Sequence, residues 1–221
     1  FSLNSENLRY DLNYIQYPIF NPNLSNAYSL FNQEIDYTSS FGYKSSKKGI
    51  GYNLNFSKNF KVSYDFGISY QNTEGHSAKN TVEQSITDSI GNFNDLILSF
   101  SIKNDSTNDI FNPNSGFYNK LNFSLSPENI SDDPYYKLNY INKNYFKLRY
   151  SNNYFFFNNN VGYARSLKTK LKTINAFSLG GANFKGFDYR GIGQKSNGVY
   201  LGGNSVVTST IGYGSSFLFD E

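Results

Sequence analysis

Through most of this chain, apolar and polar side chains alternate with a period of two residues. The clearest example covers residues 60–71, where every second side chain is aromatic or β-branched and its neighbours are Lys, Ser, Asp, Gly or Gln. Successive side chains of a strand point to opposite faces of a sheet, so this pattern predicts a strand with one apolar and one polar face. Similar segments predict about nine strands, at 8–14, 28–37, 50–57, 60–71, 96–102, 121–125, from 136, 154–164 and 204–217.

Alternation alone fits either a soluble sandwich or a membrane barrel. Strand lengths near ten residues match the ~9–11 that cross a bilayer at a tilt. The 20 Tyr and 21 Phe suit the aromatic girdles of such barrels. Because backbone polar groups cannot stay unpaired in hydrocarbon, a sheet that spans a membrane must close. The sequence therefore predicts an all-β, antiparallel, up-and-down transmembrane β-barrel.

The predicted connections alternate in length. Residues 18–23, 58–59 and 151–153 form short turns, 39–48 and 127–134 form longer ones, and 71–93 and 167–200 form long loops, the first with a short helix expected within 79–89. Short turns on one rim and long loops on the other are typical of outer-membrane barrels, although 104–116 is long for its rim. Within 28–37, the neighbouring apolar residues Leu30 and Phe31 predict a bulge.

The composition excludes several kinds of chemistry. The chain has no Cys and one histidine, His76, so disulfides, thiolate sites and multi-histidine metal sites cannot form. Asp105 and Asp109 lie in a turn, where Asp normally caps the backbone. Lysines are scattered and the net charge is only +3, which argues against nucleic acid as a partner. We expect no enzyme activity, no metal and no cofactor. Since the chain also lacks Met, we expect a piece of a longer protein.

The segment from 166 to 200 departs from the alternation. It contains Phe177-Ser178-Leu179-Gly180-Gly181 and then Phe184-Lys185-Gly186-Phe187. Gly180 and Gly181 permit a tight turn, and Gly186 can adopt a positive φ. Lys185 would then be presented between two aromatic anchors. A glycine-containing surface loop with no further role is the alternative that the residues leave open.

These two motifs resemble the loop-six signature of the Omp85 superfamily, whose usual core is Val/Ile-Arg-Gly-Phe. Gly202-Gly203-Asn204 and the Pro113-x-x-Gly116 turn are also similar to the family pattern. The resemblance covers most of the chain, 1–221, and implies an incomplete barrel of about nine of sixteen strands, without POTRA domains or the terminal strands. The basic residue is implied to fold back into the lumen and pair with carboxylates of the wall.

This chain departs from the family pattern at two positions. Lys185 replaces Arg, so planar bidentate pairing is lost, and Gly212 stands where an acidic wall residue is common. The implied site is a luminal anchor made of Gly180, Gly181, Phe184, Lys185, Gly186 and Phe187.

The resemblance also implies a function and a location. A protein of this type resides in the bacterial outer membrane and folds and inserts other β-barrel proteins, with the lipid bilayer, client outer-membrane proteins and accessory assembly lipoproteins as partners. A lateral seam between terminal strands would template client strands by β-augmentation. The alternatives are a secretion or autotransporter-assembly pore of the same superfamily, a passive diffusion porin, and a soluble β-sandwich adhesin.

Overall fold

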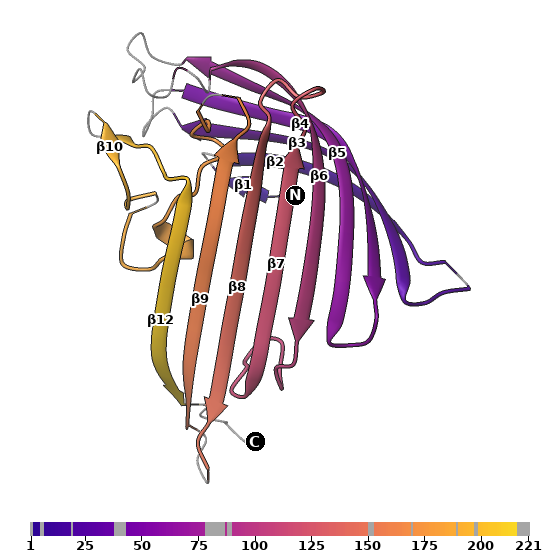
Figure 1. The fold of residues 1–221 in the computed structure, drawn as a ribbon, viewed down its shortest axis with the longest axis vertical. Coiled ribbons are helices and arrows are strands. Elements are labelled where there is room, and N and C mark those ends of the chain that lie inside the picture. Colours follow the sequence, from indigo (N-terminus) through magenta and orange to yellow (C-terminus); the bar gives the residue numbers. More distant parts are fainter. Residues whose placement is uncertain are drawn as a thin grey trace.

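Ten strands of this chain form one continuous antiparallel sheet, in which every strand pairs with its neighbour in the chain order β1-β2-β3-β4-β5-β6-β7-β8-β9-β12 (Figure 1). The computed structural model describes residues 2–4, 7–18, 20–37, 43–77, 87, 90–149, 153–168, 170–188, 190–196 and 199–215. The sheet strands are β1 (Ser2–Asn4), β2 (Asn7–Gln16), β3 (Leu24–Tyr37), β4 (Tyr43–Ser57), β5 (Val62–Ser77), β6 (Gly91–Asp105), β7 (Gly116–Ser126), β8 (Tyr135–Lys147), β9 (Asn153–Ser166) and β12 (Ser205–Ser215).

A long connection separates β9 from β12, yet the two strands pair over their whole length, from Tyr163 opposite Ser205 to Asn153 opposite Ser215. The connection carries a short 3-10 helix, η2 (Gly181–Asn183), and a hairpin of β10 (Lys195–Ser196) and β11 (Val199–Tyr200). The sheet curves into an open wall, and the connection lies beside β9 and β12 (Figure 1). The predicted all-β, up-and-down architecture is confirmed.

The two faces of the wall differ as the alternation predicts. The register places the apolar side chains of neighbouring strands opposite one another on a single face, as with Tyr52 opposite Ile68 and Ile68 opposite Leu98. These side chains are half-exposed: Phe66 retains 51% of its accessible surface and Tyr70 48%. Within the described part of the chain, only Tyr135, Ala164, Leu171 and Val206 are buried hydrophobic residues. In the part of the chain that the structure describes, the apolar face packs against no second sheet, which rules out a β-sandwich.

The height of the apolar face fits a membrane. On β5 the apolar side chains run from Val62 to Tyr70. Eight steps of about 3.4 Å along the strand give roughly 27 Å, or about 20 Å of height at a tilt of ~40°. Outer-membrane barrels present an outward apolar band about 25 Å tall. Aromatic pairs reinforce the face, including Phe66 against Phe100 with ring centroids 4.8 Å apart.

Three sequence predictions need correction. The loop expected at 39–48 is wrong from residue 43 onward, because β4 begins at Tyr43 and pairs with β3 and β5. The loop expected from residue 71 is also too long, since β5 continues to Ser77. No bulge occurs at Leu30 and Phe31, where the register with β2 and β4 is continuous. Phe31 instead points to the polar face and covers Gly49, where an added Cβ would lie 2.6 Å from its ring.

The corrected strands change the lengths of the connections. Residues 17–23, 58–61, 106–115 and 148–152 connect strands at one rim, and 38–42, 78–90, 127–134 and 167–204 connect them at the other. The difference in connection length between the two rims therefore depends chiefly on residues 78–90 and 167–204, because the connection 38–42 is short. The helix expected within 79–89 lies outside the described residues, apart from Thr87. Among the residues that the structure describes, no helix is both long and apolar enough to cross a membrane.

The turn at 106–115 confirms the capping role predicted for its carboxylates. Asp105 Oδ1 accepts the backbone N–H of Thr107 at 3.1 Å, and Asp109 Oδ1 accepts that of Phe111 at 2.7 Å. Gly116 follows with φ +95°, and an added Cβ there would lie 2.2 Å from the carbonyl oxygen of Ser106. Only glycine fits such a position.

Candidate functional site

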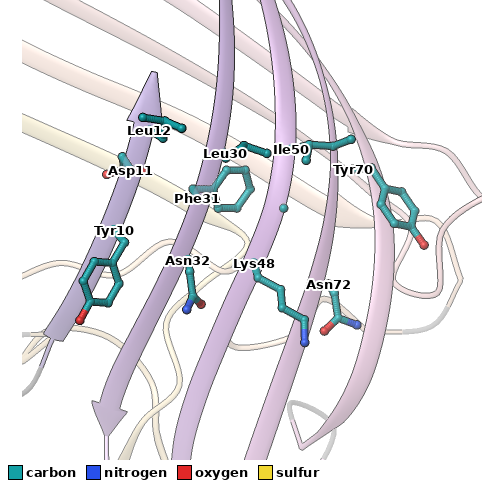
Figure 2. Close-up of a pocket in the computed structure, with 11 residues that line it drawn as sticks. Tyr10, Asp11, Leu12, Leu30, Phe31, Asn32, Lys48, Ile50, Tyr70 and Asn72 are labelled. Atoms are coloured by element: carbon teal, nitrogen blue, oxygen red, sulfur yellow. The ribbon is translucent and has the colours of Figure 1, made fainter. Parts of the chain in front are cut away.

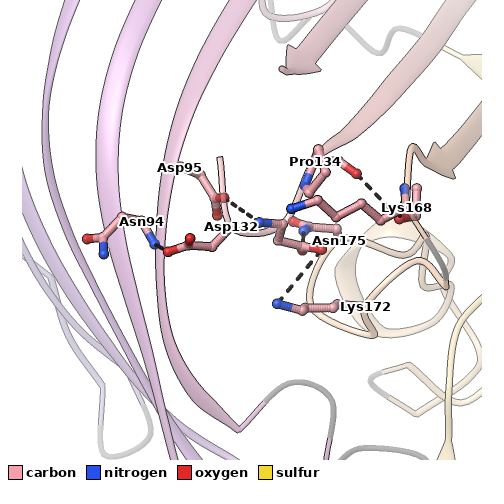
Figure 3. Close-up of polar contacts among 9 residues, drawn as sticks. Asn94, Asp95, Asp132, Pro134, Lys168, Lys172 and Asn175 are labelled. Atoms are coloured by element: carbon pink, nitrogen blue, oxygen red, sulfur yellow. Dashed lines mark hydrogen bonds and ion pairs between the residues drawn. The ribbon is translucent and has the colours of Figure 1, made fainter. Parts of the chain in front are cut away.

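The long connection between β9 and β12, residues 167–204, lies on the polar, concave face of the wall; we call it the luminal loop. Three residues of the loop contact that face. The carbonyl oxygen of Asn175 accepts a hydrogen bond from Lys137 Nζ, and the Phe177 ring lies over Gly162. The ammonium of Lys172 lies over the Phe93 ring. All three wall residues belong to the face opposite the apolar one. Figure 3 shows Lys172 and Asn175 on the inner side of the curved sheet.

The base of the luminal loop is held by a buried carboxylate, Asp133, in the connection between β7 and β8. Its side chain accepts a 2.6 Å hydrogen bond from Asn175 Nδ2 and forms an ion pair with Lys172 Nζ at 3.8 Å. The backbone N–H of Asp133 donates to Asp95 Oδ1 on β6 at 2.8 Å. These contacts join the loop to the connection between β7 and β8 and, through it, to β6. Charge-assisted hydrogen bonds of this kind are among the strongest in proteins.

Burial has an electrostatic consequence at Asp133. Only 6% of its side chain is accessible. Burial raises the pKa of the Asp133 carboxyl above its ordinary value, and the nearby ammonium of Lys172 opposes that rise. The ion pair thus compensates part of the cost of burying the carboxylate.

A second group of contacts packs the base against β8 and β9. Tyr135, Ala164 and Leu171 form a small buried cluster, with Ile97, Ala176 and Phe177 packed against it. The Phe177 ring lies over Gly162, where an added Cβ would be 2.5 Å from Cζ, and the ammonium of Lys137 lies 4.2 Å from the ring centroid. The absence of a side chain at residue 162 therefore makes room for the aromatic ring of the loop.

Backbone pairing closes the loop onto itself. Phe177 and Gly203 exchange two N–H···O hydrogen bonds of 2.9 Å, which bring the start of the loop next to the start of β12. Leu179 forms an isolated bridge with Ile192. Arg190 is buried, with φ +56°, and Nη2 donates to the carbonyl oxygen of Thr173 at 3.4 Å.

The tip of the loop contains the predicted motif. Gly180 and Gly181 adopt φ +120° and +67° and lead into η2, and Gly186 adopts φ +91°, as predicted for a tight turn. Asn183 ties the turn together, because its Oδ1 accepts the N–H of Gly180 at 2.9 Å. The rings of Phe184 and Phe187 pack with centroids 5.7 Å apart.

Lys185 lies between these rings in the sequence and is exposed. A hollow of about 790 Å³ separates the tip from the wall, and Phe184 and Lys185 line it together with residues of β8, β9 and β12, including Lys143, Asn158 and Thr208. No carboxylate is among these lining residues. The ion pairs found among the described residues do not include Lys185, so the implied pairing with the wall stays a prediction.

The residues that hold the base were not singled out by the sequence. Lys172, Asn175 and Arg190 belong to no motif, and Asp133 follows an unremarkable Ser-Asp pair in the chain. Their partners are 17 to 42 residues away, so only the three-dimensional fold brings them together. The position of Gly212 is also explained, because the ring of Phe156 on β9 occupies the space where a side chain at 212 would lie.

A single antiparallel wall with an outward apolar face and a glycine-rich loop on its inner face defines a protein of the transmembrane β-barrel class. The chain belongs to the Omp85 superfamily, because residues 1–220 match the model of the Omp85 superfamily domain. Among solved structures, BamA from Haemophilus ducreyi lacking POTRA domains 1–3 is similar, with a TM-score of 0.85 and 20% identity. The match covers 99% of this chain and 47% of that one, so this chain spans about half of that structure. No curated protein matched the chain.

Proposed function

We propose that this chain is part of the barrel of an outer-membrane assembly factor, which folds and inserts other β-barrel proteins in the bacterial outer membrane. Membership of the Omp85 superfamily and the likeness to the BamA fold support this proposal. Client barrel proteins and the lipid bilayer would be its partners, and accessory lipoproteins would assist it. Its role would be conformational, with no covalent chemistry.

The observation that supports the proposal most directly is the attachment of the luminal loop to the inner face of the wall. A long glycine-rich loop anchored at its base by Asp133 and Phe177 occupies the inner face, with its tip free to contact further wall residues across the hollow. We infer that Gly180, Gly181, Phe184, Lys185, Gly186 and Phe187 form a conformational anchor inside the lumen.

Replacing Lys185 by Glu in the full-length protein tests this function. The substitution reverses the charge at the exposed tip, and we expect the amount of folded client barrels in the outer membrane to fall. Lys170→Glu is the matched control, because Lys170 is an exposed lysine of the same loop with the same change of charge. If the amount of folded client barrels is the same in Lys185→Glu and Lys170→Glu, Lys185 does not have the proposed role.

The same cells separate the alternative functions. If the protein is a secretion or autotransporter-assembly pore, client barrel levels stay constant and a secreted or surface-anchored protein is lost instead. A passive porin would conduct ions freely in planar bilayers without either loss.

A further inference from the structure

The outer face of the wall is hollowed over β2–β5, on the side opposite the luminal loop. Two adjoining hollows of about 560 Å³ and 620 Å³ share Leu12, Leu30, Ile50 and Tyr70 in their linings and so form one groove. Each of the two hollows has the volume of a small-molecule site. Figure 2 shows side chains of β2, β3, β4 and β5 that line the groove.

The half of the groove toward the short-turn rim is apolar. Tyr14, Tyr28, Tyr52 and Ile68 line it, and three tyrosine rings pack in sequence, with centroids 6.2 Å apart for Tyr14 and Tyr28 and 5.3 Å for Tyr28 and Tyr52. These side chains belong to the face assigned to lipid. Hydrocarbon is therefore the matching occupant of this half.

The other half lies toward the long-loop rim and is polar. Register places Tyr10, Asn32, Lys48 and Asn72 side by side on β2, β3, β4 and β5. Asn32 Oδ1 and Asn72 Oδ1 are covered and have no hydrogen-bond partner. The Lys48 side chain lies between the two amides (Figure 2), and 60% of it is exposed. Buried amide oxygens without a partner are costly, so a ligand whose hydroxyl groups reach them and donate hydrogen bonds gains affinity.

The charges beside the polar half argue against an anionic head group. Lys48 already pairs with Glu74 at 3.2 Å, and Lys44 pairs with Asp36 at 2.8 Å. Register adds the carboxylate of Glu34 on the same face. Among the residues that the structure describes beside the groove, the two lysines face three carboxylates, so a phosphate would meet no unneutralised cation there. Neutral hydroxyl donors fit the unpaired amide oxygens better.

We propose that this groove binds a glycolipid of the surrounding membrane. An acyl chain lies over the tyrosine rings and Ile68, and the sugar hydroxyls donate to Asn32 Oδ1 and Asn72 Oδ1. The groove crosses the boundary between the apolar and polar zones of the outer face, which is where the head of a membrane lipid meets its chains. The site would hold one lipid in a fixed place on the β2–β5 side of the wall.

The test uses the full-length protein in nanodiscs of phosphatidylglycerol that contain a minor fraction of either digalactosyl diacylglycerol or phosphatidic acid. Native mass spectrometry counts the lipids that stay bound after release. We expect the galactolipid to be retained in preference to phosphatidic acid, with one copy bound most firmly. Because each lost hydrogen bond weakens binding about fivefold, Asn32→Leu with Asn72→Leu should abolish this preference.

Asn119→Leu with Asn142→Leu is the matched control. These amides also lie on the outer face, where Asn142 Nδ2 donates to Asn119 Oδ1 at 2.7 Å, and they do not line the groove. The control should retain the galactolipid like the wild type. Equal retention of both lipids, preference for phosphatidic acid, or equal loss in the control pair would each overturn the proposal.

Discussion

Removal of the Asp133 carboxylate should release the base of the luminal loop. Asp133→Ala deletes the 2.6 Å hydrogen bond from Asn175 and the 3.8 Å ion pair with Lys172. A hydrogen bond to a charged group contributes about 1.5–3 kcal/mol, and the long ion pair adds less. Loss of the unfavourable burial of the carboxylate offsets part of this sum. We expect a net cost of about 2 kcal/mol to loop attachment, which is roughly a 30-fold increase in local opening.

Hydrogen exchange of the full-length protein, read by mass spectrometry, measures this opening directly. The amides of Phe177 and Gly203 report on the loop, because each donates to the carbonyl of the other. Their exchange should accelerate about 30-fold, while residues 153–166 of β9 keep their protection. Asp133→Asn should accelerate exchange much less, since the amide oxygen still accepts from Asn175.

A double-mutant comparison isolates the ion pair. In a Lys172→Met background, Asp133→Ala should have a smaller effect than in the wild type, because the ion pair that it removes is already absent. Unchanged exchange at Phe177 in Asp133→Ala would show that the carboxylate does not hold the loop.

Two further predictions concern the same wall. Gly162→Val should displace the Phe177 ring, at a cost of about 1–3 kcal/mol typical of overpacking, and should increase proteolysis of the luminal loop; adding Phe177→Ala should restore part of the protection. Acid stability should depend on Asp109, because two backbone N–H groups of its turn lower the pKa of its carboxyl. Its contribution is present above the ordinary pKa of about 4 and is lost as the pH falls through the lowered value. Asp109→Asn should therefore be less stable at pH 7 and lose less stability than the wild type on acidification, in urea unfolding followed by gel mobility.

The sequence predicts the wall well where the strands lie in the apolar band. Residues 60–71 alternate strictly there because one face contacts lipid and the other the polar lumen. Beyond the band both faces are polar, so the alternation disappears although the strands continue, as in 43–48 of β4 and 72–77 of β5. The alternation is interrupted at Phe31 for a different reason, because this aromatic side chain lies on the luminal face and covers Gly49.

The candidate site was predicted only in part. Local glycine geometry identified the turns at Gly180 and Gly186, because a positive φ is a property of single residues. The anchoring by Asp133 was not foreseen, since it depends on a connection 42 residues away from Asn175. Contacts of this kind have no local pattern in the sequence.

The orientation of the wall is the claim on which the rest of this account depends. The chain contains no Cys, so single cysteines can be introduced at Ile68 and at Ser69, two neighbours on opposite faces of β5. In intact outer membranes we expect a lipid-confined probe to contact Ile68→Cys, and a small water-soluble maleimide to label only Ser69→Cys. Labelling of Ile68→Cys by the water-soluble reagent, with Ser69→Cys in contact with lipid, would contradict the account.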